Sequence, residues 1–296
     1  MRSRSRNMVL CTLITSLLLP AALSGQADPR LDRLKDEALE MVEDQAKMVQ
    51  EIVDMVFSFS ELGFQEFETQ RYLTGILEEN GFEIELGVAR MPSAWTARWS
   101  NGTGRPVIAL GSDVDGIPQS NQKPGVAYRD PILSMAPGHG EGHNSGQAVN
   151  IVAALAVKEL MEREDISGTL LIWPGIAEEQ LGSKAFFVRD GVFDGVDINL
   201  FTHVSSNFNV AWGQRGGNAL VSALFRFTGE TAHSAGAPWR GRSALDAIML
   251  LAQAWEYKRE HLRPPERSHY IIVDGGDQPN VVPQTATIWF FFREVD

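Results

Sequence analysis

Three short, largely apolar runs separated by helical patterns restrict this chain to few folds. The first is PVIAL at Pro106–Leu110, the second is GTLLIW, which we expect to break at Pro174, and the third is VDINLF at residues 196–201. Strands that are buried on both faces have this composition, and their alternation with helices is typical of an α/β sheet. We therefore predict an α/β domain with a mostly parallel sheet.

The helical patterns lie before and between these runs. Leu31–Phe59 contains no glycine or proline and has amphipathic spacing, which predicts one long helix. A second helix is expected to begin within SELGFQEFET (residues 60–69) and to end near Asn80, because Gly81 follows. A third is expected to begin near Ser145.

The pattern changes after Trp212. A strand with one wet face, a helix and two further strands are expected, over residues 218–229, 243–262, 268–276 and 285–294. This β-α-β-β order is the beginning of a ferredoxin-like sandwich. We predict a boundary near Gly216–Gly217, so that a first domain covers 28–216 and a second covers 217–296.

The N-terminus has the composition of a secretory signal peptide. Three arginines among the first six residues precede an apolar run at Met8–Leu19, and small residues follow up to Ala27. We predict cleavage near Ala27, which makes residues 1–27 a signal peptide and the protein periplasmic or extracellular. The apolar run is too short for a transmembrane helix, so no stable membrane anchor is expected; the alternative is an uncleaved anchor.

Charge and cysteine content exclude two classes of function. The formal net charge is −12, whereas a nucleic-acid partner would require a basic surface. Cys11 is the single cysteine and lies within the predicted signal peptide. The mature chain would therefore have no disulfide and no catalytic thiol.

Polar side chains follow each of the three predicted strands. Asp113 and Asp115 follow the first, Glu178 and Glu179 follow the second, and His203 follows the third. Because ligands of open α/β sheets bind beyond the carboxyl ends of the strands, we expect these residues to converge. Taken singly, each has an ordinary alternative: a solvated turn for the acidic pairs, or a core position for the histidine.

The loop PGHGEGHNSG, residues 137–146, adds His139, Glu141 and His143 at alternate positions. Imidazole and carboxylate groups together are ligands for zinc, manganese or cobalt. Two ions about 3.5–4 Å apart can share a water, and one of two adjacent glutamates can remain free as a general base. The combination predicts a metal site.

With these residues assembled, the chain resembles the dinuclear-metal aminoacylase and carboxypeptidase family of metallopeptidases, in the amidohydrolase branch that includes aminobenzoyl-glutamate utilisation protein B and the auxin-conjugate hydrolases. The resemblance runs from about Ser60 to the last residue. The motifs that carry it are ELGFQEFET, SDVDGIP, GHGEGHN, AEEQLGSKAF, TAHSAGAPWRGRSALDA and NVVP. It implies a catalytic domain with an inserted lid, which is also the dimerisation domain.

The resemblance assigns roles to the residues of the metal site. Glu178 matches the catalytic base. The positions that match metal ligands are Glu141, His143, Glu179 and His203. Glu141 stands where the branch usually has cysteine, and a carboxylate is a harder ligand that favours manganese or cobalt over zinc.

The remaining assignments concern support and the lid. Asp113 and Asp115 match an Asp-x-Asp pair that supports the metal loop. His233 matches a lid histidine that reaches the active site of the other protomer and polarises the scissile carbonyl. Asn280 matches a lid asparagine near the substrate carboxylate.

The resemblance therefore implies a metal-dependent amidohydrolase with two divalent ions (zinc, manganese or cobalt) that works as a homodimer. Its substrate would be a small amide or dipeptide, namely an N-acyl or aryl-acyl amino acid such as an acyl-glutamate. One alternative is a non-catalytic relative that binds small peptides. A two-metal phosphoesterase would need basic residues beside the metals, and these loops contain none.

The family's pattern extends past Asp296. It implies a further lid helix and strand, and a return to the catalytic domain that supplies one more histidine ligand. We therefore expect the catalytic domain and the lid to lack their C-terminal parts, and the 296-residue chain alone to be inactive.

Overall fold

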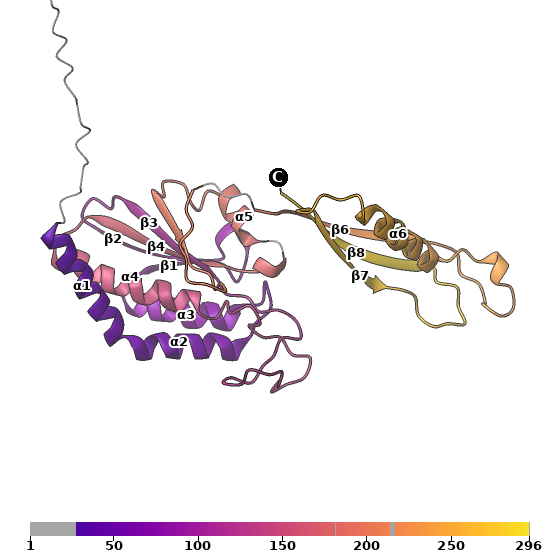
Figure 1. The fold of residues 1–296 in the computed structure, drawn as a ribbon, viewed down its shortest axis with the longest axis horizontal. Helices are drawn as coiled ribbons and strands as arrows, with labels where there is room; N and C mark the ends of the chain where they lie inside the picture. Colours follow the sequence, from indigo (N-terminus) through magenta and orange to yellow (C-terminus); the bar gives the residue numbers. More distant parts are fainter. Residues whose placement is uncertain (1–27, 181, 214–216, 296) are drawn as a thin grey trace, which may run out of the picture.

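The structure is a computed structural model that describes residues 28–180, 182–213 and 217–295. The predicted signal peptide, and Gly216 at the predicted domain boundary, lie outside the described residues. Two sheets follow one another along the chain, each with its own layer of helices (Figure 1).

The first sheet has five strands in the order β1-β2-β4-β3-β5. Their bounds are Glu83–Leu86 (β1), Trp95–Asn101 (β2), Val107–Asp113 (β3), Gly168–Gly175 (β4) and Ile198–Phe201 (β5). β3 pairs in parallel with β4 and β5, whereas β2 is antiparallel to both of its neighbours. Four of the five strands therefore run in one direction, which confirms the prediction of a mostly parallel sheet.

The core lies between this sheet and the helices on one of its faces (Figure 1). Every residue of β4 is buried, because the strand is flanked on both edges. α4, Gly146–Arg163, packs directly on β3 and β4, and its predicted start at Ser145 is confirmed by the position of the helix cap. The short helix α5, Ser183–Arg189, follows the end of β4.

The long helix predicted over Leu31–Phe59 is wrong, because two helices occupy this region. α1 covers Pro29–Asp44 and α2 covers Ala46–Phe59, and the backbone leaves the helical region at Gln45. Both helices contact α4. The break allows each helix to follow the curved surface of α4.

The predicted second helix begins later than expected. α3 covers Phe67–Glu79, and residues 60–66 form a loop in which Ser60 and Phe64 have φ values of 50° and 65°. Such left-handed positions are incompatible with a helix, and no glycine or proline announces them. The predicted stop is confirmed: Gly81 has a φ of 82° and its N–H donates to the carbonyl of Glu78.

Two strands extend beyond their predicted ends. β3 continues past Leu110 to Asp113, and β4 continues through Pro174. Pairing of β4 with β2 ends at Ile172, so a residue without an N–H interrupts no ladder on that side. β1 and β2 were not predicted at all.

The second unit has the predicted β-α-β-β order. Its elements are β6 (Ala219–Thr228), the short 3-10 helix η3 (Pro238–Arg240), α6 (Ala244–Arg259), β7 (Arg267–Asp274) and β8 (Thr285–Glu294). The antiparallel sheet has the order β6-β8-β7, and α6 covers one face through Ile248 and Ala252. Within the described part of the chain, no helix is both long enough and apolar enough to cross a membrane.

Candidate metal centre

The predicted site residues of the first domain meet at the carboxyl edge of its sheet. Asp113 is the last residue of β3, and the turn η2, Glu178–Gln180, follows β4. His203 follows β5, and the glycine-rich loop precedes α4. Ligand atoms within 4.8 Å of one another form two overlapping groups, namely Asp113 with His143 and His203, and Glu141 with His143 and Glu179.

The two histidines of these groups direct their Nε2 atoms at each other. The Nδ1 of His143 lies 3.2 Å from a carboxylate oxygen of Asp115, and the Nδ1 of His203 lies 2.7 Å from the carbonyl oxygen of Val204. Both Nδ1 atoms therefore donate, which assigns the lone pair of each neutral ring to Nε2. The two Nε2 atoms are 3.2 Å apart, so both lone pairs are aimed at one small volume.

Carboxylate oxygens surround this volume. An oxygen of Glu141 lies 4.0 Å from each Nε2 atom, and one of Asp113 lies 3.9 Å from that of His203. The Oε1 atom of Glu179 is buried and has no hydrogen-bond partner. Two imidazoles, three carboxylates and an unpaired buried oxygen are a donor set that fits divalent ions of the zinc, manganese and cobalt class.

The pKa values record how much negative charge is collected here. Burial lowers the pKa of His143, but the hydrogen bond to Asp115 and the nearby carboxylates outweigh it and raise the pKa to about 9. A hydrogen bond with Glu141, together with burial, raises the pKa of Glu179 to about 8, while the same bond lowers the pKa of Glu141. Protons thus bind where a cation would neutralise the same charges.

Asp115 supports the centre from behind and is itself buried. One of its oxygens faces the Nδ1 of His143, and the other accepts the N–H of Glu179 at 3.0 Å. It therefore orients one residue of each strand-end loop. This position suits the supporting role that the resemblance implies.

Asp113 has a partner that sequence reasoning missed. The ammonium of Lys184, in α5, lies 2.8 Å from one oxygen of this buried carboxylate and 4.4 Å from the ring centre of Phe201. Burial raises the pKa of Asp113 in spite of this positive charge. The motif AEEQLGSKAF contains Lys184, but nothing in its spacing identifies a contact with β3.

His139 points away from the centre. Its Nε2 lies 3.0 Å from the carbonyl oxygen of Val56, at the end of α2, and burial lowers its pKa to about 4. The ring is therefore neutral at ordinary pH. It anchors the glycine-rich loop on α2, whereas Glu141 and His143 of the same loop face the ligand groups.

A cavity of about 660 Å³ opens beside the centre. Glu141, Glu178 and Glu179 line it from the first domain. Asn218, Leu220 and Arg293 line it from the ends of β6 and β8. Glu178 thus borders open space that can admit a substrate, whereas Glu179 lies closer to the histidines.

His233 and Asn280 are close to each other but distant from this cavity. His233 pairs with Val281 in an isolated bridge, and the N–H of Ser234 donates to the carbonyl of Asn280. β6 runs from the cavity to the far end of its sheet, roughly 30 Å along a ten-residue strand, before this segment begins (Figure 1). The structure therefore does not bring these two residues to the metal centre of their own chain.

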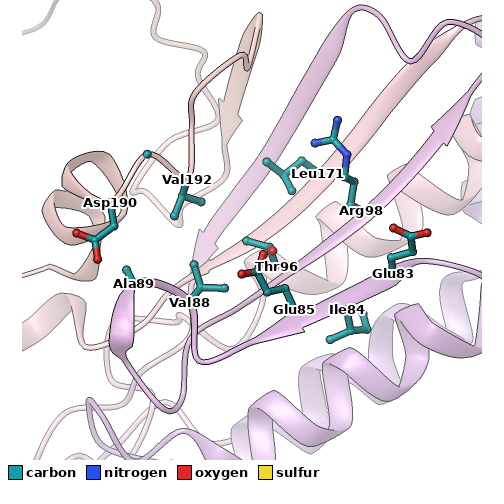
Figure 2. A pocket seen from close by; sticks show the side chains of 11 residues that line it. Glu83, Ile84, Glu85, Val88, Ala89, Thr96, Arg98, Leu171, Asp190 and Val192 are labelled. Carbon is teal, nitrogen blue, oxygen red and sulfur yellow. The ribbon is translucent and has the colours of Figure 1, made fainter.

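A second cavity, of about 460 Å³, lies beside β1 and the 3-10 helix η1, Val88–Arg90 (Figure 2). Acidic Glu83, Glu85 and Asp190 and basic Arg98 stand around an apolar floor (Figure 2). None of the residues predicted for the site lines it. The larger cavity at the strand ends is therefore the better candidate for substrate.

Comparison with known proteins extends over most of the chain. Residues 215–296 match the M20_dimer family, described as a peptidase dimerisation domain. One of the two p-aminobenzoyl-glutamate hydrolase subunits of Escherichia coli (strain K12) is 36% identical over 247 residues, which are 82% of this chain and 50% of that protein. The Xaa-Arg dipeptidase of Homo sapiens is 27% identical over 286 residues, 92% of this chain and 61% of that protein. The chain thus spans only about half of the length of the first of these curated relatives.

Solved structures share the fold. An aminobenzoyl-glutamate utilization protein from Klebsiella pneumoniae has a TM-score of 0.58 at 18% identity, over 87% of this chain and 69% of that one. A dinuclear metal binding peptidase of the M20 family from Bacillus subtilis has a TM-score of 0.51 at 19% identity, over 84% and 65%. The resemblance inferred from the motifs is confirmed: the chain is a relative of the M20 metallopeptidases and carries their dimerisation domain at residues 215–296.

Proposed function

We propose that this protein is an exported, metal-dependent amidohydrolase that cleaves the amide bond of an N-acyl or aryl-acyl amino acid. The observation that carries the proposal is the pair of Nε2 atoms 3.2 Å apart, ringed by carboxylates at the edge of a cavity of about 660 Å³. Relatives that are named as hydrolases of p-aminobenzoyl-glutamate and of indole-3-acetyl-aspartic acid support this substrate class. The N-terminal sequence pattern supports export.

Glu141, His143, Glu179 and His203 would hold two divalent ions of zinc, manganese or cobalt. Bound ions of this kind lower the pKa of water and polarise a carbonyl group. Asp115 fixes His143 by accepting its Nδ1 proton, so that Nε2 stays free as a ligand.

Glu178 would carry the proton transfers. Its carboxylate takes a proton from the attacking water as the new carbon–oxygen bond forms. It then delivers that proton to the amide nitrogen as the carbon–nitrogen bond breaks, which releases the amine. The place of Glu178 on the wall of the cavity supports this role.

The test uses the longest natural form of the protein. We expect bound divalent metal by mass spectrometry and hydrolysis of acyl-glutamates, including p-aminobenzoyl-glutamate, that stops after chelation. Metal with no hydrolysis of any acyl or aryl-acyl amino acid would favour the alternative of a non-catalytic peptide-binding relative. Absence of metal affinity would contradict the proposal.

A further inference from the structure

Glu66 is a fully buried carboxylate directly behind the turn that carries the two glutamates. One of its oxygens accepts the N–H of Ala177 at 2.7 Å. The other accepts the hydroxyl of Ser93, also at 2.7 Å. The residue lies in the loop before α3, 111 positions away from Ala177 in the sequence.

The turn needs such a partner because its backbone is strained. Ala177 is completely buried and has a φ of 47°, in the left-handed region that disfavours residues with a side chain. Its carbonyl accepts the N–H groups of Gln180 and Gly182. Strained positions of this kind persist only where the surroundings hold them.

The loop before α3 also packs directly on this residue. A Cβ atom on Gly63 would lie 2.8 Å from the Cα atom of Ala177, so no side chain fits between the two backbones. The loop therefore holds Ala177 by close packing as well as by a hydrogen bond. Glu178 and Glu179 follow Ala177 immediately, and their directions depend on its backbone angles.

We propose that Glu66 is a positioning residue that holds the left-handed turn at Ala177 and thereby sets the directions of Glu178 and Glu179. The contact itself is independent of any reaction, and only its consequence for catalysis rests on the proposed function. Burial also raises the pKa of Glu66, so a neutral amide of the same shape is a close substitute. Glutamine can accept the N–H of Ala177 through its carbonyl oxygen and donate to Ser93.

The experiment compares Glu66→Gln, Glu66→Ala and a control, Asn101→Ala, by hydrogen exchange of the turn at residues 177–180. Asn101 donates to the carbonyls of Met161 and Ile166 at the start of β4, far from the site, so its loss destabilises the same domain. We expect exchange in the turn to accelerate about tenfold or more in Glu66→Ala, and to stay near the unmodified rate in Glu66→Gln and in the control. If Glu66→Ala fails to fold, Ser93→Ala, which removes one contact of Glu66, is expected to accelerate exchange about threefold.

A second readout is the affinity for Co²⁺, which should fall in Glu66→Ala and recover in Glu66→Gln. Unchanged exchange of the turn in Glu66→Ala, or equal loss in Glu66→Gln, would overturn the inference. An unmodified protein without Co²⁺ affinity, but with the expected exchange pattern, would overturn the proposed function and leave the positioning role supported.

Discussion

Glu178 and Glu179 are adjacent in the chain, but their surroundings differ. Glu179 has a buried, unpaired oxygen next to Glu141 and His143, whereas Glu178 lines the cavity. We predict that Glu178→Gln keeps its metal and lowers kcat by about 10²–10⁴-fold, the usual worth of a general base. Glu179→Gln should instead weaken metal binding by about 10²-fold or more, since a ligand is lost. Metal content and kcat of the two variants, measured side by side, decide the matter; full activity with full metal in both would show that the assignment is wrong.

The raised pKa values at the centre predict a pH dependence. The folded chain without metal holds protons on Glu179 up to about pH 8 and on His143 up to about pH 9, above their ordinary values of 4.5 and 6.5. These protons stabilise the folded state at low pH, and that stabilisation is lost as the pH rises through the folded values. Metal must displace the same protons, so its binding tightens over the same interval.

We therefore expect the Tm of the metal-free protein to fall between pH 6 and pH 9, and the increase in Tm on adding Zn²⁺ or Mn²⁺ to grow over that range. Thermal unfolding with and without metal, at constant ionic strength, measures both. The variant Glu179→Gln is the control, because it removes one of the two titrating groups and should flatten the curve. An increase in Tm that is independent of pH would contradict the prediction.

At the scale of elements, α4 is positioned by close contact with β3. A Cβ atom on Gly146, the first residue of α4, would lie 1.8 Å from the hydroxyl of Ser112 and 2.7 Å from its Cβ atom. We predict that Gly146→Ala destabilises the protein by about 1–3 kcal/mol, as overpacking does. Gly75→Ala, inside α3 with no atom within 4 Å, should stabilise it by about 0.5–1 kcal/mol. Urea unfolding measures both, and equal effects would show that the contact at Gly146 relaxes freely.

Sequence patterns predicted the elements that are buried and missed those that are exposed or irregular. β4 is buried throughout and its apolar run identified it, whereas β1 has the sequence EIEL and is mostly exposed. The loop at residues 60–66 was taken for helix because its left-handed residues are Ser60 and Phe64 rather than glycine. Local pattern carries no information about such positions when tertiary contacts impose them.

The candidate site divides in the same way. Acidic residues and histidines at the ends of predicted strands were found because sheet topology alone places them at one edge. Glu66 and Lys184 were not found, because their roles depend on contacts with Ala177 and Asp113, 111 and 71 positions away. Separations of this size can be recognised only once the fold is known.

At the scale of the whole molecule, the lid presents His233 far from the centre of its own chain (Figure 1). The Nδ1 of His233 accepts the N–H groups of Ala235 and Gly236, which leaves Nε2 as the donor. A donor at this place can polarise a carbonyl only if it reaches the centre of another protomer. The match of residues 215–296 to a dimerisation domain supports such an arrangement.

This arrangement predicts complementation between two inactive variants of the longest natural form. Glu178→Gln lacks the base but retains His233, and His233→Ala retains the base. In a mixed dimer, the centre of the His233→Ala protomer would receive His233 from its partner. Equimolar mixing and exchange of protomers gives half mixed dimers with one competent centre each, so activity should recover to about one quarter of the unmodified level. If His233 acted within its own chain, every centre in the mixture would lack one group, and activity would stay at the level of the separate variants; light scattering before and after mixing verifies that dimers are present.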